Sequence, residues 1–243
     1  MKMPSTLACL RIFGYTASIV LHWGNVLSLI GIDYGPFGED VKRFGSMQFR
    51  YMTCWNFFMQ STHASLGLLC EYLLYKNSKK KDYRLPKHLR GARDTLFAAI
   101  VVPGTFLVAT VFWSLFLYDR NLILPAFVDQ VLSPTSNHIM HTLIVPLALW
   151  ELAFQPRNVP KSHTKNIMHI LMLMVAYMAV LIYTYYERGF WIYPIFGHIY
   201  GTIYFYMLVL FIAFIAFFYY FVQWELVKLI WGGQRVGINK KIH

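Results

Sequence analysis

The sequence SNHIMHTLIVPLALWE at residues 136–151 decides how the chain is organised, because it begins polar and continues as an apolar, membrane-compatible helix. Asn137 is a candidate N-cap, whose side-chain oxygen accepts hydrogen bonds from the free backbone N–H groups of the first turn. His138 and His141 lie three residues apart and therefore on one face of the expected helix. Pro146 has no N–H for the preceding turn, so we expect a bend about one turn beyond His141. Burying an imidazole at that depth of a membrane costs free energy, so such a residue usually has a chemical function or a hydrogen-bond partner.

The composition identifies a membrane protein. The chain has 243 residues, of which 57% are hydrophobic and only 14% are charged. A soluble domain of this length could not hide that much apolar surface, so lipid must be the solvent for most of it. The net charge of +11 could suggest nucleic acid, but the basic residues stand between apolar runs without interleaved aromatic residues. Anionic lipid headgroups are the expected partner, and no nucleic acid is expected.

Six apolar segments are long enough to cross a bilayer, which takes about 20 residues each. They cover approximately residues 7–30, 52–75, 95–118, 138–154, 167–186 and 202–231. The sequence therefore predicts an all-α fold, in which the whole chain (1–243) is one transmembrane domain of six helices.

Basic residues are distributed unevenly between the two sides of this six-helix layout. Sixteen lysines and arginines fall on the side that holds both termini, and five fall on the other side. Because basic loops stay in the cytosol, both termini are predicted to be cytosolic. The last four residues, KKIH at 240–243, then resemble a dilysine signal for retrieval to the endoplasmic reticulum. The alternative is a basic tail that binds acidic lipid.

The same layout brings a hydroxyl and an imidazole to one depth of the membrane. Thr53 opens the second segment and His141 opens the fourth, so both lie near the non-cytosolic face and can meet. A hydroxyl paired with an imidazole is the minimum apparatus for nucleophilic acyl transfer. The residues alone leave other interpretations open, because Thr53 could be a helix N-cap and His141 a paired interfacial residue.

A metal site is the main chemical alternative at these histidines. His138 and His141 could be two metal ligands, and further histidines at 22, 63, 169 and 198 lie in the membrane region. Membrane di-iron enzymes need dense histidine clusters, whereas these residues are scattered singly, so no metal or other cofactor is predicted. A pump or coupled transporter would need charges in mid-membrane, and the acidic residues fall near the ends of the segments.

Four sequence runs, taken in order, resemble one known family. They are FRYMTCWN (49–56), VFWSLFLYDRNLILP (111–125), NHIMHT (137–142) and FWIYPIFGHI (190–199). Together they closely resemble the androgen-induced and androgen-dependent TFPI-regulating protein family, over nearly the whole chain. The members of that family are integral membrane hydrolases of fatty acid esters of hydroxy fatty acids, with a threonine nucleophile and a histidine.

The resemblance assigns roles to particular residues. Thr53 matches the family threonine and His141 matches the second histidine of its NHxMH motif. Asn56, three residues after the threonine, stands where some relatives carry an acid. Asn137 and His138 are neighbours of His141 that could support it, and His198 lies in a further family-like run.

We therefore expect a threonine-type carboxylic ester hydrolase that takes a lipid substrate from the membrane of the endoplasmic reticulum. The resemblance implies that the substrate is a fatty acid ester of a hydroxy fatty acid. A non-enzymatic lipid-binding scaffold or regulator is the second interpretation, and a lipid carrier is the third.

Overall fold

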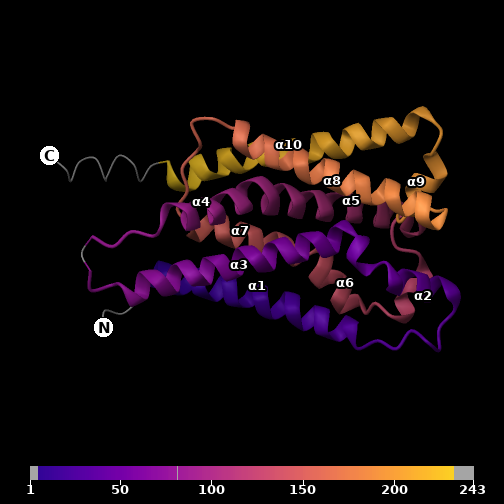
Figure 1. Cartoon of the computed structure of the whole chain (residues 1–243), viewed down its shortest axis with the longest axis horizontal. Coiled ribbons are helices and arrows are strands. Elements are labelled where there is room, and N and C mark those ends of the chain that lie inside the picture. Colours follow the sequence, from indigo (N-terminus) through magenta and orange to yellow (C-terminus); the bar gives the residue numbers. More distant parts are fainter. Residues whose placement is uncertain (1–4, 81, 233–243) are drawn as a thin grey trace.

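The computed structural model describes residues 5–80 and 82–232, and the regular elements in these two ranges are all helical (Figure 1). The longer helices are α1 (Thr6–Ile30), α2 (Glu39–Ser46), α3 (Met52–Lys76), α4 (Lys87–Leu96), α5 (Val102–Asp119), α6 (Pro134–His141), α7 (Ile144–Phe154), α8 (Thr164–Arg188), α9 (Pro194–Ile199) and α10 (Ile203–Trp231). Short 3-10 turns are η1 (Gln48–Arg50), η3 (Arg120–Leu122) and η4 (Ala126–Gln130), and a π-helical turn, η2 (Phe97–Val101), joins α4 to α5. The predicted all-α class is confirmed. The KKIH sequence at 240–243 lies outside the described residues.

The predicted segments correspond closely to helices. Helices α1, α3, α8 and α10 begin and end within a few residues of four predicted segments. The third segment was expected to begin at residue 95, but its helix already begins at Lys87, because Pro86 ends the preceding loop and the charged residues that follow continue the helix. By length and apolar composition, three described helical stretches could cross a membrane, namely Lys87–Leu122, Thr164–Arg188 and Ile203–Trp231.

The fourth segment differs from the prediction in two respects. Its helix α6 begins at Pro134, and Ser133 is the N-cap, whose hydroxyl accepts from the amide of Ser136 at 3.1 Å. The expectation that Asn137 caps the helix is wrong, because a serine followed by proline is the stronger start signal and lies four residues earlier. The helix also stops completely after His141 and restarts as α7 at Ile144, where only a bend was expected.

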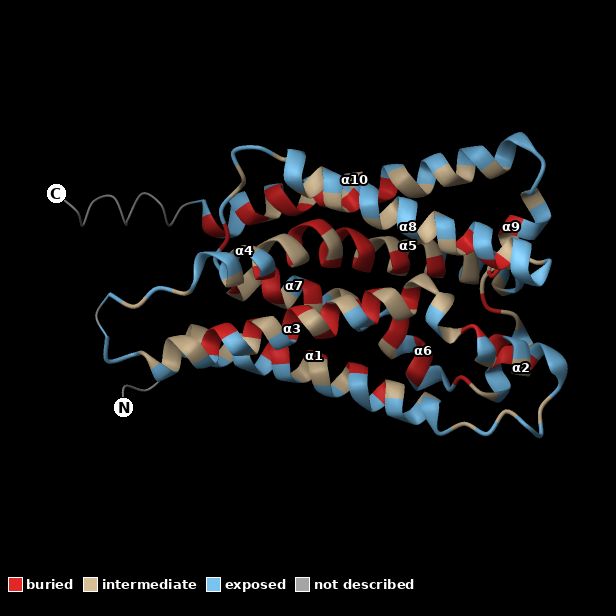
Figure 2. Cartoon of the chain, viewed as in Figure 1, coloured by how far each residue is buried: buried red, intermediate tan, exposed pale blue. Residues whose placement is uncertain are grey.

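The helices form an elongated bundle in which α5 and α7 lie between two outer layers (Figure 1). Helices α8 and α10 make one outer layer, and α1 packs on α3 and α7 on the other side. The start of α1 and the end of α10 lie at the same end of the bundle. Helix α8 buries only three of its residues, whereas buried residues are concentrated in η2 and the first turn of α5 (Figure 2).

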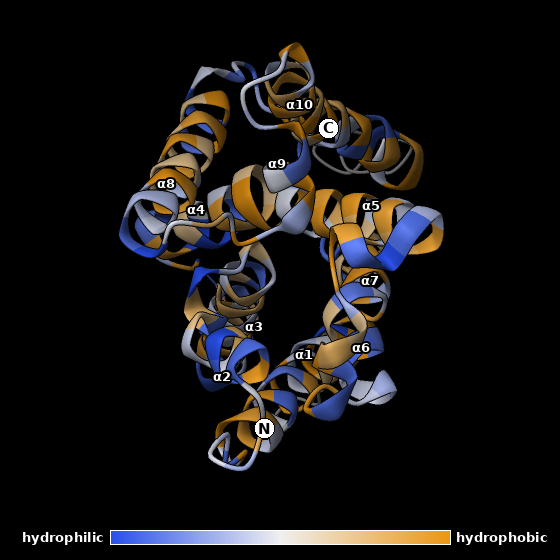
Figure 3. Cartoon of the chain, turned by 90° about the vertical axis from the view of Figure 1, so that its right-hand side faces the viewer, coloured by the Kyte–Doolittle hydropathy of each residue, from blue (hydrophilic) through white to orange (hydrophobic). Residues whose placement is uncertain are grey.

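The exposed surface of α8 and α10 is apolar, as the end-on view of Figure 3 shows. Large side chains such as Val175, Leu210 and Phe214 are more than 60% exposed. A contiguous apolar surface of this kind is not stable in water, and it fits helices that face lipid hydrocarbon. The protein is a multi-pass membrane protein.

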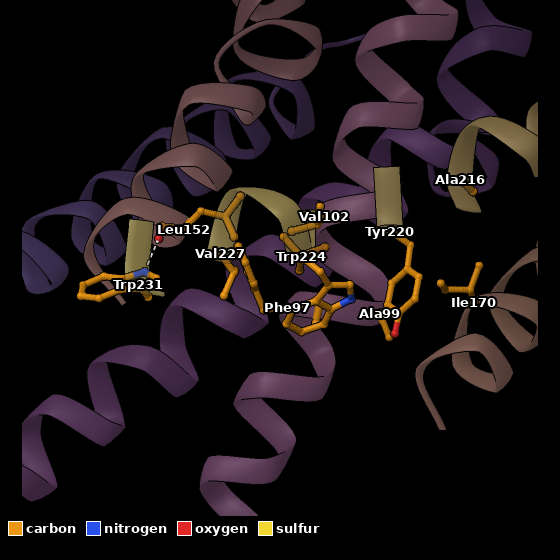
Figure 4. Packing of buried hydrophobic residues seen from close by; sticks show 12 residues of the cluster. Phe97, Ala99, Val102, Leu152, Ile170, Ala216, Tyr220, Trp224, Val227 and Trp231 are labelled. Carbon is orange, nitrogen blue, oxygen red and sulfur yellow. Dashed lines mark hydrogen bonds between the residues drawn. The ribbon is translucent and has the colours of Figure 1, made fainter. Parts of the chain in front are cut away.

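One hydrophobic cluster joins α10 to the centre of the bundle (Figure 4). Phe97, Tyr220 and Trp224 are almost fully buried in it. Trp231 closes the cluster at its end, and its indole N–H donates to the carbonyl of Leu152 at 3.0 Å. These contacts fix α10 against the start of α5 and the end of α7.

Two glycines allow α1 to approach its neighbours closely. A Cβ atom at Gly14 would overlap the indole of Trp150 in α7, and one at Gly67 in α3 would overlap the ring of Tyr15. Small residues at crossing points are the usual means by which membrane helices pack backbone to backbone. The tight crossing of α1 with α3 and α7 depends on them.

Buried ion pairs lie at one end of the bundle. Arg11 of α1 donates to Glu71 at 2.7 and 3.0 Å, and Arg157 donates to Glu151. His63 is also 3.4 Å from Glu151. Glu71 is 18 residues beyond Thr53 on α3, which places it ~27 Å away at a rise of about 1.5 Å per residue. The ionic end of the bundle is therefore separate from the site described below.

Candidate functional site

Thr53 is the second residue of α3, and its side chain does not cap the helix. The N-cap is Tyr51, which has an extended backbone (φ −77°, ψ 137°). The Thr53 hydroxyl lies 3.2 Å from Nε2 of His141, and both side chains are more than 90% buried. The carbonyl of Phe49, one turn earlier, is occupied by the indole N–H of Trp55 at 2.9 Å. The hydroxyl is thus paired with the imidazole and not with its own helix.

Two oxygens of Asn137 fix the state of the His141 ring. Nδ1 lies 3.0 Å from the Asn137 carbonyl oxygen and 2.8 Å from its Oδ1. A carbonyl oxygen can only accept, so Nδ1 must carry a proton. In the neutral imidazole Nε2 then has a free lone pair, and the Thr53 hydroxyl donates to it. Asn137 therefore holds His141 in the tautomer that a general base requires.

The break between α6 and α7 follows directly after His141. Pro146 cannot donate to the preceding turn, and the carbonyl of Thr142 instead accepts from Val145 N at 3.1 Å. Side chains satisfy other carbonyls at the break. Trp113 Nε1 donates to the His141 carbonyl at 3.2 Å, and Gln60 Nε2 donates to the Ile144 carbonyl at 3.2 Å. The interruption is thus built into the surrounding helices.

Phe112 of α5 covers the face of the imidazole. The two ring centroids are 3.5 Å apart and the planes are 7° from parallel. The ring of His141 is therefore held on its edge by Asn137 and on its face by Phe112. Both contacts limit rotation of the imidazole away from Thr53.

Thr53 and His141 open into a cavity of about 170 Å³. In the same measure one water needs roughly 10–15 Å³, so the cavity is large enough for part of an organic molecule. It is lined mainly by apolar side chains of α5, α8 and α10, such as Leu107, Leu173 and Ile212. Asn137 is not part of the lining and lies behind the imidazole. A hydroxyl and an imidazole at the wall of an apolar cavity suit the cleavage of an apolar ester.

Two tyrosine hydroxyls lie at the start of α3. The amide of Met52 donates to the hydroxyls of Tyr177 and Tyr193, at 2.8 and 3.0 Å. The next amide, that of Thr53, has no acceptor in the part of the chain that the structure describes. Sequence reasoning did not find these tyrosines, because α8 and the loop before α9 are more than a hundred residues away in the chain. The one available signal was that Tyr193 belongs to the run at 190–199.

The chain is similar to known proteins over most of its length. A family model described as FAR-17a/AIG1-like protein matches residues 10–226. The chain belongs to this family. Androgen-dependent TFPI-regulating protein is 33% identical in Homo sapiens (199 residues, 80% of this chain and 81% of the relative) and 31% identical in Rattus norvegicus (196 residues, 80% and 81%). Androgen-induced gene 1 protein of Homo sapiens is 29% identical over 131 residues, which are 54% of this chain and 55% of the relative. No solved structure matches the chain.

Asn56, which stands in one of the runs that resemble the FAR-17a/AIG1-like family, lies one turn beyond Thr53. Its Oδ1 accepts from the hydroxyl of Thr105 at 3.2 Å, and Gln60 donates to the same hydroxyl at 2.6 Å. Since Gln60 also bonds the Ile144 carbonyl, these three side chains link α3, α5 and the restart of α7. Asn56 thus belongs to the hydrogen-bond network that joins the helices around the site, and it does not line the cavity.

The other two predicted residues lie apart from the cavity. His138 is exposed, its Nδ1 is 3.1 Å from the hydroxyl of Thr142, and its ring stacks on Trp113. His198 is exposed in the last turn of α9 and does not line the cavity. The described residues contain no group of three or more histidines, cysteines or acids arranged to hold a metal ion.

The charged pair Asp119–Arg120, also in a run that resembles the FAR-17a/AIG1-like family, organises the loop between α5 and α6. Asp119 Oδ1 accepts from the amide of Asn121 at 2.9 Å. Arg120 forms a two-pronged ion pair with Asp129 at 2.7 and 2.8 Å and donates to the carbonyl of Leu124 at 3.1 Å. The loop leads directly into α6, so this pair helps to position the helix that carries His141.

Proposed function

We propose that this protein is an integral membrane esterase that hydrolyses fatty acid esters of hydroxy fatty acids. The observation that carries the proposal is the 3.2 Å contact between the Thr53 hydroxyl and His141 Nε2 at the wall of an apolar cavity. The substrate class rests on the resemblance of the four sequence runs to the androgen-induced and androgen-dependent TFPI-regulating proteins. Membership in the FAR-17a/AIG1-like family supports the assignment.

The reaction follows from the positions of the two side chains. Oγ1 of Thr53 attacks the ester carbonyl carbon while its proton passes to Nε2 of His141. The tetrahedral intermediate collapses, the bond to the hydroxy-acid oxygen breaks, and that oxygen takes the proton from His141. Water, activated by the same imidazole, then cleaves the acyl-threonine and releases the fatty acid. The chemistry needs no metal ion.

A six-span topology with both termini in the cytosol is part of this proposal. It is supported by the sixteen-to-five distribution of basic residues and by the common end of the bundle at which α1 begins and α10 ends (Figure 1). Thr53 and His141 would then lie near the non-cytosolic face. We also propose residence in the endoplasmic reticulum, on the ground of the KKIH sequence at 240–243.

The test is hydrolysis of a hydroxy-fatty-acid ester by purified protein in nanodiscs. Thr53→Ala and His141→Ala should each lower kcat by more than ~10³-fold, because the nucleophile and base act as a unit. Thr53→Ser should keep measurable activity. Thr62→Ala is the matched control on the same helix, since the Thr62 hydroxyl is exposed and bonds the carbonyl of Phe58 at 2.8 Å. Full activity of correctly folded Thr53→Ala would remove the proposed nucleophile.

A fluorophosphonate probe separates this proposal from a non-enzymatic regulator. The probe labels a hydroxyl activated by a base and does not label an ordinary threonine. Wild type should be labelled at Thr53, and His141→Ala should not. Absence of labelling and of turnover across several acyl chain lengths would favour the regulator.

A further inference from the structure

The hydroxyls of Tyr177 and Tyr193 form a pair beside the proposed nucleophile. Their oxygens are 2.8 Å apart, and both accept from the amide of Met52, the residue before Thr53. Both side chains line the cavity that Thr53 and His141 also line. Tyr177 comes from the middle of α8 and Tyr193 from the N-cap of α9, so two separate elements bring hydroxyls to this point.

The direction of the hydrogen bond between the two hydroxyls can be reversed. Tyr177 donates to the carbonyl of Arg50 at 3.2 Å, and in that arrangement Tyr193 donates to Tyr177. A hydroxyl proton rotates freely about its C–O bond. When Tyr177 turns its proton to Tyr193, the Tyr193 proton has no acceptor in the described residues and is available to a molecule in the cavity. This rotation breaks the hydrogen bond from Tyr177 to the Arg50 carbonyl, which at 3.2 Å is the longest of the hydrogen bonds that the two tyrosine hydroxyls make.

Ester cleavage in an apolar cavity needs such a donor. Attack on the carbonyl carbon places a negative charge on the carbonyl oxygen, and in an apolar cavity that charge must be met by hydrogen bonds from the protein. Among the described residues that line the cavity, Thr53 and His141 are occupied in the proton transfer. The remaining polar lining includes the tyrosine pair and Gln48, whose Nε2 is buried without a partner.

We propose that Tyr193, backed by Tyr177, donates a hydrogen bond to the ester carbonyl oxygen and to the oxyanion formed on it. The amide of Thr53, which has no acceptor in the described residues, supplies a second donor. Tyr193 gives no proton away: the oxyanion forms as Thr53 Oγ1 bonds to carbon, and it disappears as the leaving oxygen departs with the proton from His141. This assignment rests on the proposed esterase function.

The first test is kinetic and uses the full chain in nanodiscs with a hydroxy-fatty-acid ester. Tyr193→Phe keeps the ring and removes only the donor, so kcat should fall about 100-fold with little change in KM, as on loss of one oxyanion donor. Tyr177→Phe should lower kcat about 3- to 10-fold, because it removes only the hydroxyl that hydrogen-bonds to Tyr193 and leaves the donor itself in place. Tyr185→Phe is the control, since Tyr185 lies outside the cavity and packs on Trp191.

The second test separates catalysis from simple packing around Met52. A trifluoromethyl ketone forms a charged tetrahedral adduct with the nucleophile, whereas an ether analogue of the substrate has no carbonyl oxygen. Tyr193→Phe should weaken binding of the ketone about 100-fold and leave binding of the ether unchanged. Equal weakening of both would mean a structural role and would overturn the proposal.

The outcomes also distinguish this inference from the proposed function. If wild type hydrolyses the ester and Tyr193→Phe matches Tyr185→Phe in kcat, the oxyanion assignment is wrong while the esterase stands. If in addition Gln48→Leu lowers kcat about 100-fold, the donor to the oxyanion is the side-chain amide of Gln48. If wild type neither hydrolyses the ester nor reacts with the fluorophosphonate, the esterase itself is wrong and this inference ends with it.

Discussion

The imidazole of His141 lies parallel to the ring of Phe112, with 3.5 Å between the centroids and 7° between the planes. The stack fixes the one rotation of the imidazole that its hydrogen bonds to Asn137 leave free. Phe112 belongs to α5 and His141 is the last residue of α6, so the contact also joins the two helices.

Replacement of Phe112 by leucine should lower kcat by up to about tenfold, since an aromatic stack contributes about 0.5–1.5 kcal/mol to holding the ring in place. Ester hydrolysis in nanodiscs measures the effect. Phe106→Leu is a matched control on the same helix, because Phe106 stacks on Tyr219 away from the cavity. An equal loss in both variants would mean that general loosening of α5, and not the stack on His141, is responsible.

Replacement of Asn137 by alanine should lower kcat by about 3- to 10-fold. The side-chain acceptor of the Nδ1 proton is lost, but the Asn137 carbonyl at 3.0 Å still accepts it, so only one neutral hydrogen bond disappears. KM should hardly change, because Asn137 does not line the cavity. Asn166→Ala in the first turn of α8 serves as the control. A KM effect without a kcat effect would contradict a positioning role.

The buried pair of Glu151 and Arg157 predicts a large stability effect. Glu151→Ala leaves the Arg157 guanidinium buried without its main partner and should cost about 3–5 kcal/mol of unfolding free energy. The exposed pair Glu225–Lys228 is the control, and Glu225→Ala should cost no more than about 1 kcal/mol. Unfolding of both variants in mixed micelles gives the comparison. Similar losses would mean that the buried pair contributes no more than a surface pair.

The crossing of α1 and α3 predicts a steric effect. Gly67→Ala places a methyl group against the ring of Tyr15 and should destabilise the bundle by about 1–3 kcal/mol. Gly24→Ala, on α1, meets no atom within 4 Å and should leave the melting temperature unchanged or slightly higher. Thermal melting in detergent measures both. An unchanged Tm for Gly67→Ala would show that the ring of Tyr15 can move aside.

The hydropathy of the chain was sufficient to predict helices, because a bilayer-length apolar run has few other stable conformations. The adjacency of Thr53 and His141 followed from their positions at the starts of two segments that open on one side. The termination of α6 after His141 was less accessible. It depends on hydrogen bonds that Trp113 and Gln60 donate to the carbonyls of His141 and Ile144, and these bonds form only once α5 and α3 are in place.

Other parts of the site depend on contacts between distant segments. The position of Asn137 behind His141 required the helix to begin at Pro134 with Ser133 as its N-cap, and the sequence interpretation chose the wrong cap. The meeting of Tyr177 and Tyr193 at the Met52 amide involves residues more than a hundred positions away. Neither periodicity nor composition contains that information, since both report only on local environment.

The scarcity of charge around the cavity has a consequence for turnover. The described residues that line it include no lysine or arginine. An ester is neutral and dissolves well in such surroundings, whereas the fatty acid released from acyl-threonine carries a carboxyl group that ionises in water. A carboxylate without a cationic partner is strongly disfavoured in an apolar medium. The proposed reaction would thus convert a ligand that the cavity retains into one that it expels, and product inhibition by the free acid should be weak.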